Sequence, residues 1–206
     1  MPDISLTDFI DFVASTGTPR LTKVRNAKCR DAYDPRFDYW KQLREAIVAY
    51  HEPNNVLGKE PYFRNFLNGL NPESNKSQPY SDVIDNYKRF LGKKTIAKLP
   101  IQRTTWTHNG LSVRVNPEIF LNINGSRELF KLYFKQDALS KQKADTILTL
   151  MSVALPVTSN VAQFAVYDAR NNRTIRASNP DPNLMILVRA EADAFISIWN
   201  EIECNQ

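Results

Sequence analysis

Two Asn-Gly dipeptides restrict the folds open to this chain more than any other feature of its sequence. Asn109-Gly110 and Asn124-Gly125 each lie between alternating apolar and polar residues. Both central positions of a type I′ turn need positive φ, which Asn and Gly tolerate, so each dipeptide predicts the two-residue loop of a β-hairpin. Together the two hairpins predict a three-stranded antiparallel meander over residues 101–135.

The second turn also predicts which residues face one another across its hairpin. If Asn124 and Gly125 form the loop, Ile123 lies opposite Ser126. The pairs that follow outward are Leu121–Glu128, Ile119–Phe130 and Glu118–Lys131. Cross-strand partners share a face of the sheet, so one face is apolar and is expected to lie against a helix. That face carries Ile119, Leu121, Ile123, Phe130, Leu132 and Phe134.

The opposite face of this hairpin holds the candidate functional site. It mixes apolar with charged side chains, namely Glu118, Phe120, Asn122, Arg127, Leu129, Lys131, Tyr133 and Lys135. An acid that faces an amine on such a surface, as Glu118 faces Lys131, is a candidate for binding a metal ion or a phosphate. A solvated cross-strand salt bridge is the alternative interpretation of the same pair.

Helices are predicted on both sides of the meander, which places the chain in the α+β class. Apolar residues at helical spacing predict helices at 7–14, 34–50, 62–67, 81–91, 139–154 and 192–203. A second hairpin is predicted from strands at 162–168 and 173–177, and the apolar run 184–188 predicts either a short strand or the start of the last helix. The expected organisation is a helical N-terminal segment with a long loop excursion (1–80), followed by a sheet domain with an αβββαβ-like core (81–206).

Length and composition favour one main hydrophobic core in an intracellular protein. The chain has 206 residues and is 42% hydrophobic, and no apolar run approaches the roughly 20 residues that span a bilayer. Its two cysteines, Cys29 and Cys204, show no metal-ligand spacing, which favours reduced thiols. We therefore expect a cytoplasmic location and no membrane partner.

Positive charge is concentrated in one part of the chain. Between Asn86 and Pro117 there is no Asp or Glu, whereas the formal net charge of the whole chain is only +5. The cationic residues of this stretch are Lys88, Arg89, Lys93, Lys94, Lys98, Arg103 and Arg114. Such asymmetry indicates a polyanion partner, with nucleic acid as the first candidate, while a solvated basic face is the alternative. A second basic run, residues 20–30, predicts a connector or a phosphate contact.

From Ser81 onward the predicted order is helix, three antiparallel strands, helix and strand. Residues 81–168 thereby resemble the core of the PD-(D/E)xK nuclease-like superfamily, which places an acid on the second strand and a (D/E)-x-K motif on the third. Pro117-Glu118 matches the first position, and Lys131 matches the motif lysine. The resemblance implies catalytic roles for Glu118 and Lys131, with Glu118 as a ligand of Mg²⁺.

One motif position departs from this pattern. Leu129 stands where the family has a second carboxylate, and the neighbouring Glu128 is predicted to point to the apolar face. Because Mg²⁺ sites of this class use two carboxylates, the loss of one undermines the chemistry. Either an acid of the preceding helix, Asp82 or Asp85, completes the metal site, or the core is catalytically inactive.

Three functions therefore stay open. One is an active Mg²⁺-dependent nuclease that uses Glu118 and Lys131. Another is a protein-interaction or assembly component, whose basic surface binds an acidic protein or the acidic C-terminal helix of a second copy in a homodimer. The first choice is a nucleic-acid-binding protein with an inactive nuclease-like core, in which the phosphate backbone is contacted by Lys88, Lys93, Lys94, Lys98, Arg114, Lys131 and Lys135.

Overall fold

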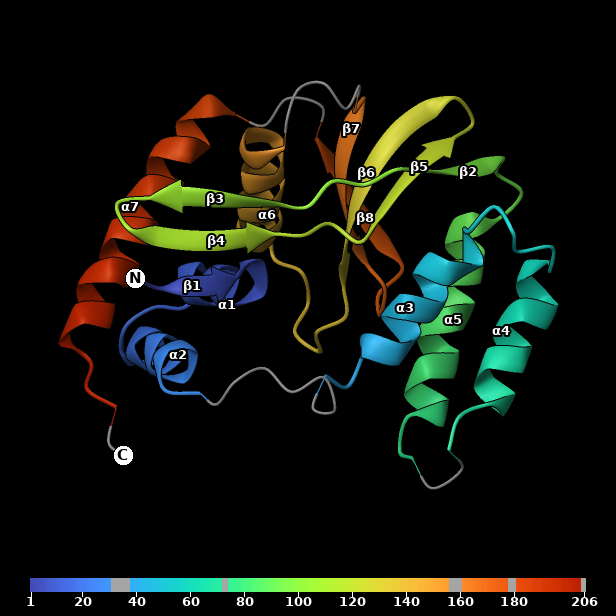
Figure 1. The fold of residues 1–206 in the computed structure, drawn as a ribbon, viewed down its shortest axis with the longest axis horizontal. Helices are drawn as coiled ribbons and strands as arrows, with labels where there is room; N and C mark the ends of the chain where they lie inside the picture. The colour runs from blue at the N-terminus through green and yellow to red at the C-terminus, as the bar shows by residue number, and fades with distance from the viewer. Residues whose placement is uncertain (31–37, 72–73, 156–160, 178–180, 205–206) are drawn as a thin grey trace.

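A computed structural model describes residues 1–30, 38–71, 74–155, 161–177 and 181–204 (Figure 1). The fold is α+β, as predicted. Its described helices are α1 (Leu6–Val13), α2 (Thr18–Lys28), α3 (Lys41–Tyr50), α4 (Lys59–Asn68), α5 (Ser77–Leu91), α6 (Lys141–Ala154) and α7 (Pro182–Glu201). Its described strands are β1 (Asp3–Ser5), β2 (Ile96–Leu99), β3 (Thr104–His108), β4 (Leu111–Val115), β5 (Ile119–Ile123), β6 (Ser126–Tyr133), β7 (Gln163–Asp168) and β8 (Arg173–Ala177).

The strands form two mixed sheets. The larger sheet has the order β2-β5-β6-β7-β8, in which β2, β5 and β6 are antiparallel and β6 runs parallel to β7. Parallel neighbours need a crossover connection, which α6 supplies. The smaller sheet has the order β1-β4-β3, with β1 parallel to β4.

Both Asn-Gly hairpins form, with positive φ at Asn109, Gly110, Asn124 and Gly125. The predicted register of the second hairpin is confirmed, because the partners across it are Ile123 and Ser126, Leu121 and Glu128, and Ile119 and Phe130.

The prediction that both hairpins join in one meander over 101–135 is wrong. The β3–β4 hairpin belongs to the smaller sheet, and β5 takes the short strand β2 as its neighbour instead. Asn116 and Pro117 separate β4 from β5, and Pro117 has no N–H with which to continue a strand ladder. The antiparallel meander of the larger sheet is therefore β2-β5-β6.

Helices cover both faces of the larger sheet (Figure 1). The predicted apolar face packs against α3, α4 and α5, and all six of its predicted residues are buried there: Ile119, Leu121, Ile123, Phe130, Leu132 and Phe134. The other face buries Phe120, Leu129 and Tyr133 in a second cluster with α1, α6, α7 and the smaller sheet. Both clusters take residues from each side of position 80, so the domain boundary placed there stays a prediction.

Several helix boundaries differ from those predicted. α5 begins at Ser77, not at Ser81, because Pro79 fits the first turn of a helix, where an N–H has no intrahelical partner. The basic run 20–30 is not a connector, since most of it forms α2. The run 184–188 opens the last helix. The predicted start of the helix at 34–50 lies outside the described residues, and α3 is described from Lys41.

Cys29 and Cys204 form a disulfide, so the expectation of reduced thiols is wrong. Cys29 caps the C-terminus of α2 and Cys204 follows α7, and contacts between these two helices bring together residues that are 175 positions apart. Disulfides are rare in cytosolic proteins, so the cytoplasmic location gains no support and stays a prediction. Among the described helices, none combines the length and apolar character needed to cross a bilayer.

Candidate functional site

A cleft of about 1060 Å³ opens between α3, the loop that joins β4 to β5, and the N-terminal segment. Its α3 side is one helix face, because Lys41, Arg44, Glu45, Val48 and Ala49 recur at helical spacing. The opposite face of α3 packs Leu43 and Ile47 into the core. The sequence of this helix therefore directs its charged side chains into the cleft.

Among the residues that the structure describes, positive charge outweighs negative charge in the cleft. Four described acidic residues line it, Asp38, Glu45, Glu52 and Glu118. Its described cationic residues number seven, and they are Arg30, Lys41, Arg44, Lys98, Arg103, Arg114 and Lys131. This excess of three positive charges is large beside the net charge of +5 on the whole chain, so the cleft suits an anionic ligand.

Glu118 and Lys131 meet in this cleft, as the register predicted. Their side chains form an ion pair and are only 13% and 14% exposed. The Lys131 ammonium also donates to the carbonyl oxygen of Asn116 at 3.1 Å, and the backbone N–H of Leu132 donates to Glu118 Oε2 at 2.7 Å. Each carboxylate oxygen of Glu118 thus already accepts a hydrogen bond from the protein.

Ion pairs hold most of the other cations at the cleft and connect distant parts of the chain. Arg114 on β4 pairs with Asp3 on β1 at 2.8 Å, and Lys98 on β2 pairs with Glu52 after α3. The Arg114–Asp3 pair is exposed on both sides, and such pairs contribute only about 0–1 kcal/mol each, because water and salt screen them. A phosphate can therefore replace an acid as the partner of such a cation at little cost.

Arg30 enters the cleft from the end of α2 and pairs with Asp8 at 2.8 Å. Burial alone would raise the pKa of Asp8, but hydrogen bonds from Arg30 and Ser5 and the charge of Arg30 outweigh it and hold that pKa below its usual value. Asp8 also completes the capping box of α1 with Ser5. The Arg30 side chain is thus anchored to a helix that is itself part of the core.

No family model matches the sequence, and a search of curated proteins finds no match.

The structure brings together only part of the predicted cationic set. Lys98, Arg114 and Lys131 line the cleft with Glu118. Lys88 instead binds Glu60 and Asp85, and Lys135 binds Asp11.

Two further predicted lysines follow α5. Lys94 lines a neighbouring cavity, and Lys93 is exposed beside it. Neither is among the residues that line the cleft.

Four cleft cations were not among the predicted site residues: Arg30, Lys41, Arg44 and Arg103. Arg103 lies within the basic stretch 86–117 and Arg30 within the basic run 20–30, so charge clustering was a usable signal for both. Lys41 and Arg44 lie on the polar face of an amphipathic helix, where sequence alone does not distinguish a site from an ordinary solvated surface.

The residues around Glu118 do not fit a Mg²⁺ site. Leu129 is buried in the core, and Glu128 lies on the other face of the sheet, where it pairs with Arg176 at 2.8 Å. Asp82 and Asp85 lie on α5, which packs against that same far face. Within the described residues, no group of three His, Cys, Asp or Glu side chains could hold a metal ion. The metal role of Glu118 thus stays a prediction without a second carboxylate.

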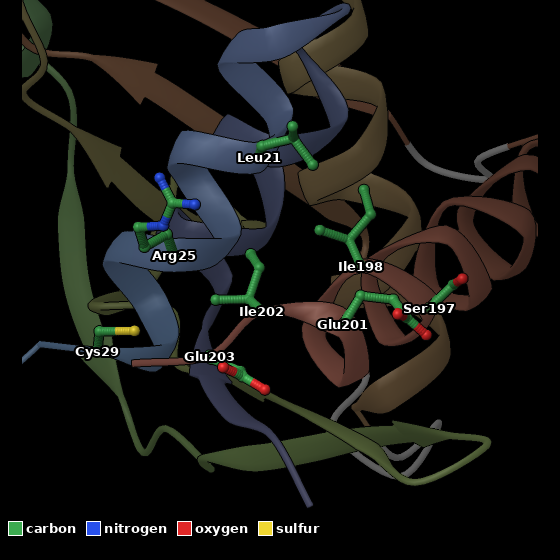
Figure 2. Close-up of a pocket in the computed structure, with 8 residues that line it drawn as sticks. All are labelled: Leu21, Arg25, Cys29, Ser197, Ile198, Glu201, Ile202 and Glu203. Atoms are coloured by element: carbon green, nitrogen blue, oxygen red, sulfur yellow. The ribbon is translucent and has the colours of Figure 1, made fainter. Parts of the chain in front are cut away.

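A separate cavity of about 840 Å³ lies between α2 and the end of α7, beside the disulfide (Figure 2). Leu21, Ile198 and Ile202 give it an apolar lining, and Arg25, Glu201 and Glu203 add charges of both signs. Its lining includes the hydroxyl group of Ser197, but none of the described residues that line it is a histidine that could act as a base. This cavity therefore carries neither the charge of an anion site nor the groups of a nucleophilic one.

Proposed function

We propose that this protein binds nucleic acid through the cleft, using its cations against the phosphate backbone, and that its nuclease-like core does not cleave. The observation that carries the proposal is the excess of cationic over acidic side chains around Glu118 and Lys131. Phosphate contacts supply most sequence-independent affinity for nucleic acid, and they need only a groove lined by Lys and Arg.

The sheet order adds support. Along the chain, α5, β2, β5, β6, α6 and β7 give a helix, three antiparallel strands, a helix and a further strand, all strands lying in one sheet. The resemblance to the PD-(D/E)xK nuclease-like superfamily assigned these three strands to the meander over 101–135, whereas in the structure β2 is the first of them and the β3–β4 hairpin is inserted after it. Glu118, directly before β5, and Lys131 on β6 are the residues that the resemblance assigns to that family's strand acid and motif lysine.

We do not propose cleavage, because none of the predicted second carboxylates lies beside Glu118 to complete a metal site. Two-carboxylate metal chemistry needs a second acid beside Glu118. The three candidate acids, Glu128, Asp82 and Asp85, bind other side chains, and Leu129 stands at the motif position. Assembly through the acidic last helix is also less well supported. Glu191 already pairs with Arg20, and Asp193 lies 3.0 Å from His108.

The test is fluorescence anisotropy with labelled single- and double-stranded DNA and RNA at two salt concentrations. We expect the logarithm of the association constant to fall steeply with the logarithm of salt concentration, by roughly 0.7–0.9 for each phosphate contact. The double variant Lys98→Gln/Arg114→Gln should bind at least tenfold more weakly and with a shallower salt slope by roughly 1.4–1.8.

Lys141→Gln is the matched control, because it removes an exposed lysine on α6 that does not line the cleft. Equal binding by the cleft variant and this control would overturn the proposal. Cleavage in Mg²⁺ that disappears in Glu118→Gln would instead establish the active nuclease.

A further inference from the structure

The cleft continues into a second, smaller cavity along the outer edge of β2. This cavity of about 440 Å³ lies among the segment after α3, the start of α4, the end of α5 and β2 itself. Glu52 and Lys98 line both spaces, and they form an ion pair with one another. The two spaces are therefore adjacent, and Lys98 can serve a ligand in either.

The smaller cavity is cationic in its own right. Besides Lys98, it is lined by Lys59 and Lys94, with Glu52 as its acidic residue. Lys59 Nζ donates to the carbonyl oxygen of Gly92 at 2.9 Å, and Lys94 donates to that of Phe90. These carbonyls end α5, and a helix C-terminus carries only about half a negative charge. The two ammonium groups are thus positioned without being neutralised by carboxylates.

Two aromatic rings, those of Tyr50 and His51, line the same cavity and lie edge to face with a centroid separation of 4.9 Å. Burial, and next the positive charge of Lys98, lower the pKa of His51 to about 4, so its ring is neutral at pH 7. Flat rings beside a cationic groove are the usual means of holding the bases of a single strand, since every base can stack.

We propose that this cavity is a second phosphate-binding site, and that it forms with the cleft one track along β2 that holds a single strand of nucleic acid. The inference rests on the proposed function. The four residues of β2 span about 13 Å, so one short strand of nucleic acid can reach both spaces. A space of about 440 Å³ has the size of a small-ligand site, which favours the single strand as the smaller ligand over a duplex.

The test compares oligothymidylates of 4 and 12 nucleotides with a duplex of 12 base pairs, again by anisotropy. We expect the 12-nucleotide strand to bind more tightly than either other probe. The variant Lys59→Gln/Lys94→Gln removes two contacts, which lowers the salt slope for this strand by roughly 1.4 and weakens its binding roughly 10- to 30-fold at 0.1 M salt.

Lys93→Gln is the matched control, because Lys93 is exposed next to Lys94 but does not line the cavity. If the double variant binds the 12-nucleotide strand as this control does, while Lys98→Gln/Arg114→Gln still weakens binding, the track is wrong and the proposed function stands. If neither double variant weakens binding, both proposals are wrong.

Lys59 and Lys94 donate hydrogen bonds to carbonyl oxygens at the end of α5, so replacing them could disturb that helix. A second measurement avoids these substitutions. The chain has only two histidines, and His108 stacks on Trp106 in the smaller sheet. In NMR spectra, assigned with His108→Gln, the 12-nucleotide strand should move the ring signals of His51 and raise its pKa, because a phosphate offsets the charge of Lys98. Signals of His51 that stay unmoved at saturation would overturn the track.

Discussion

At the scale of single residues, the main feature of the cleft is the ion pair between Glu118 and Lys131. It could be predicted because side chains on a strand alternate with a period of two, so one well-placed turn determines every pair outward from it. The same alternation places Leu129 on the face of Lys131, so the sequence also predicted that a leucine stands where the family has its second carboxylate. The companions of this pair, Arg30 and Arg44, come from segments about ninety residues away along the chain. No local pattern connects them to β5 and β6.

Removing one member of this pair should cost more than removing both. Lys131→Met leaves the mostly buried Glu118 carboxylate with the Leu132 N–H as its one remaining partner among the described residues. We expect a loss of about 2–3 kcal/mol in the free energy of unfolding, because the partly solvated carboxylate loses its counter-charge. Glu118→Gln in the same chain removes the uncompensated charge. The double variant should therefore unfold at a urea concentration closer to that of the wild type than Lys131→Met does.

The measurement is a double-mutant cycle by urea denaturation at pH 7. Strictly additive losses in the two single variants would mean that the pair has no coupling energy and that each group is solvated independently.

At the scale of elements, local turn chemistry was predictable and sheet membership was not. Asn-Gly signals identified both hairpins, and the capped or amphipathic helices α1, α3 and α6 were recognised from spacing. Strand β2 has four residues, too few for a pattern, and β1 has three. These two short strands determine which sheet each hairpin joins. Strand β2 pairs with β5, where the prediction had placed β4, and β1 pairs with β4. The predicted meander failed for this reason.

The second hairpin turn offers a test at this scale. Gly125 has φ of +93°, and a Cβ atom there would meet nothing within 4 Å. Gly125→Ala should therefore lower the free energy of unfolding by about 1–2 kcal/mol through backbone strain alone. Gly69→Ala is the control, because Gly69 has φ of −84° and its Cβ would make only ordinary contacts.

Thermal or urea denaturation of both variants measures the difference. If Gly125→Ala is as stable as Gly69→Ala, the turn does not need positive φ, and the register of β5 and β6 loses its anchor.

At the scale of the whole molecule, the disulfide closes almost the entire chain into one loop. The two cysteines allow one intrachain pairing, but that it forms was not predictable, because no local pattern shows that residues 175 positions apart come together. The chain-entropy model assigns a loop of this length about 5 kcal/mol of stabilisation, since the unfolded state loses conformational freedom. Cys29→Ser/Cys204→Ser should therefore unfold at a markedly lower urea concentration.

Comparison of wild type with and without a dithiol reductant is the control for this variant. Reduced wild type should match the serine variant, whereas oxidised wild type should be more stable than both. Equal stability of all three would show that the cross-link does not constrain the unfolded chain.

The same cross-link determines how the molecule responds to mechanical force. Tension applied between residue 1 and residue 204 passes through the sulfur bridge, so residues 30–203 carry no load. Only β1, α1 and α2 can be drawn out, over a contour of roughly 100 Å for the first 28 residues. Because β1 pairs with β4 and Asp3 pairs with Arg114, pulling would remove one wall of the cleft while the larger sheet stays folded, so the cleft would open before the protein unfolds.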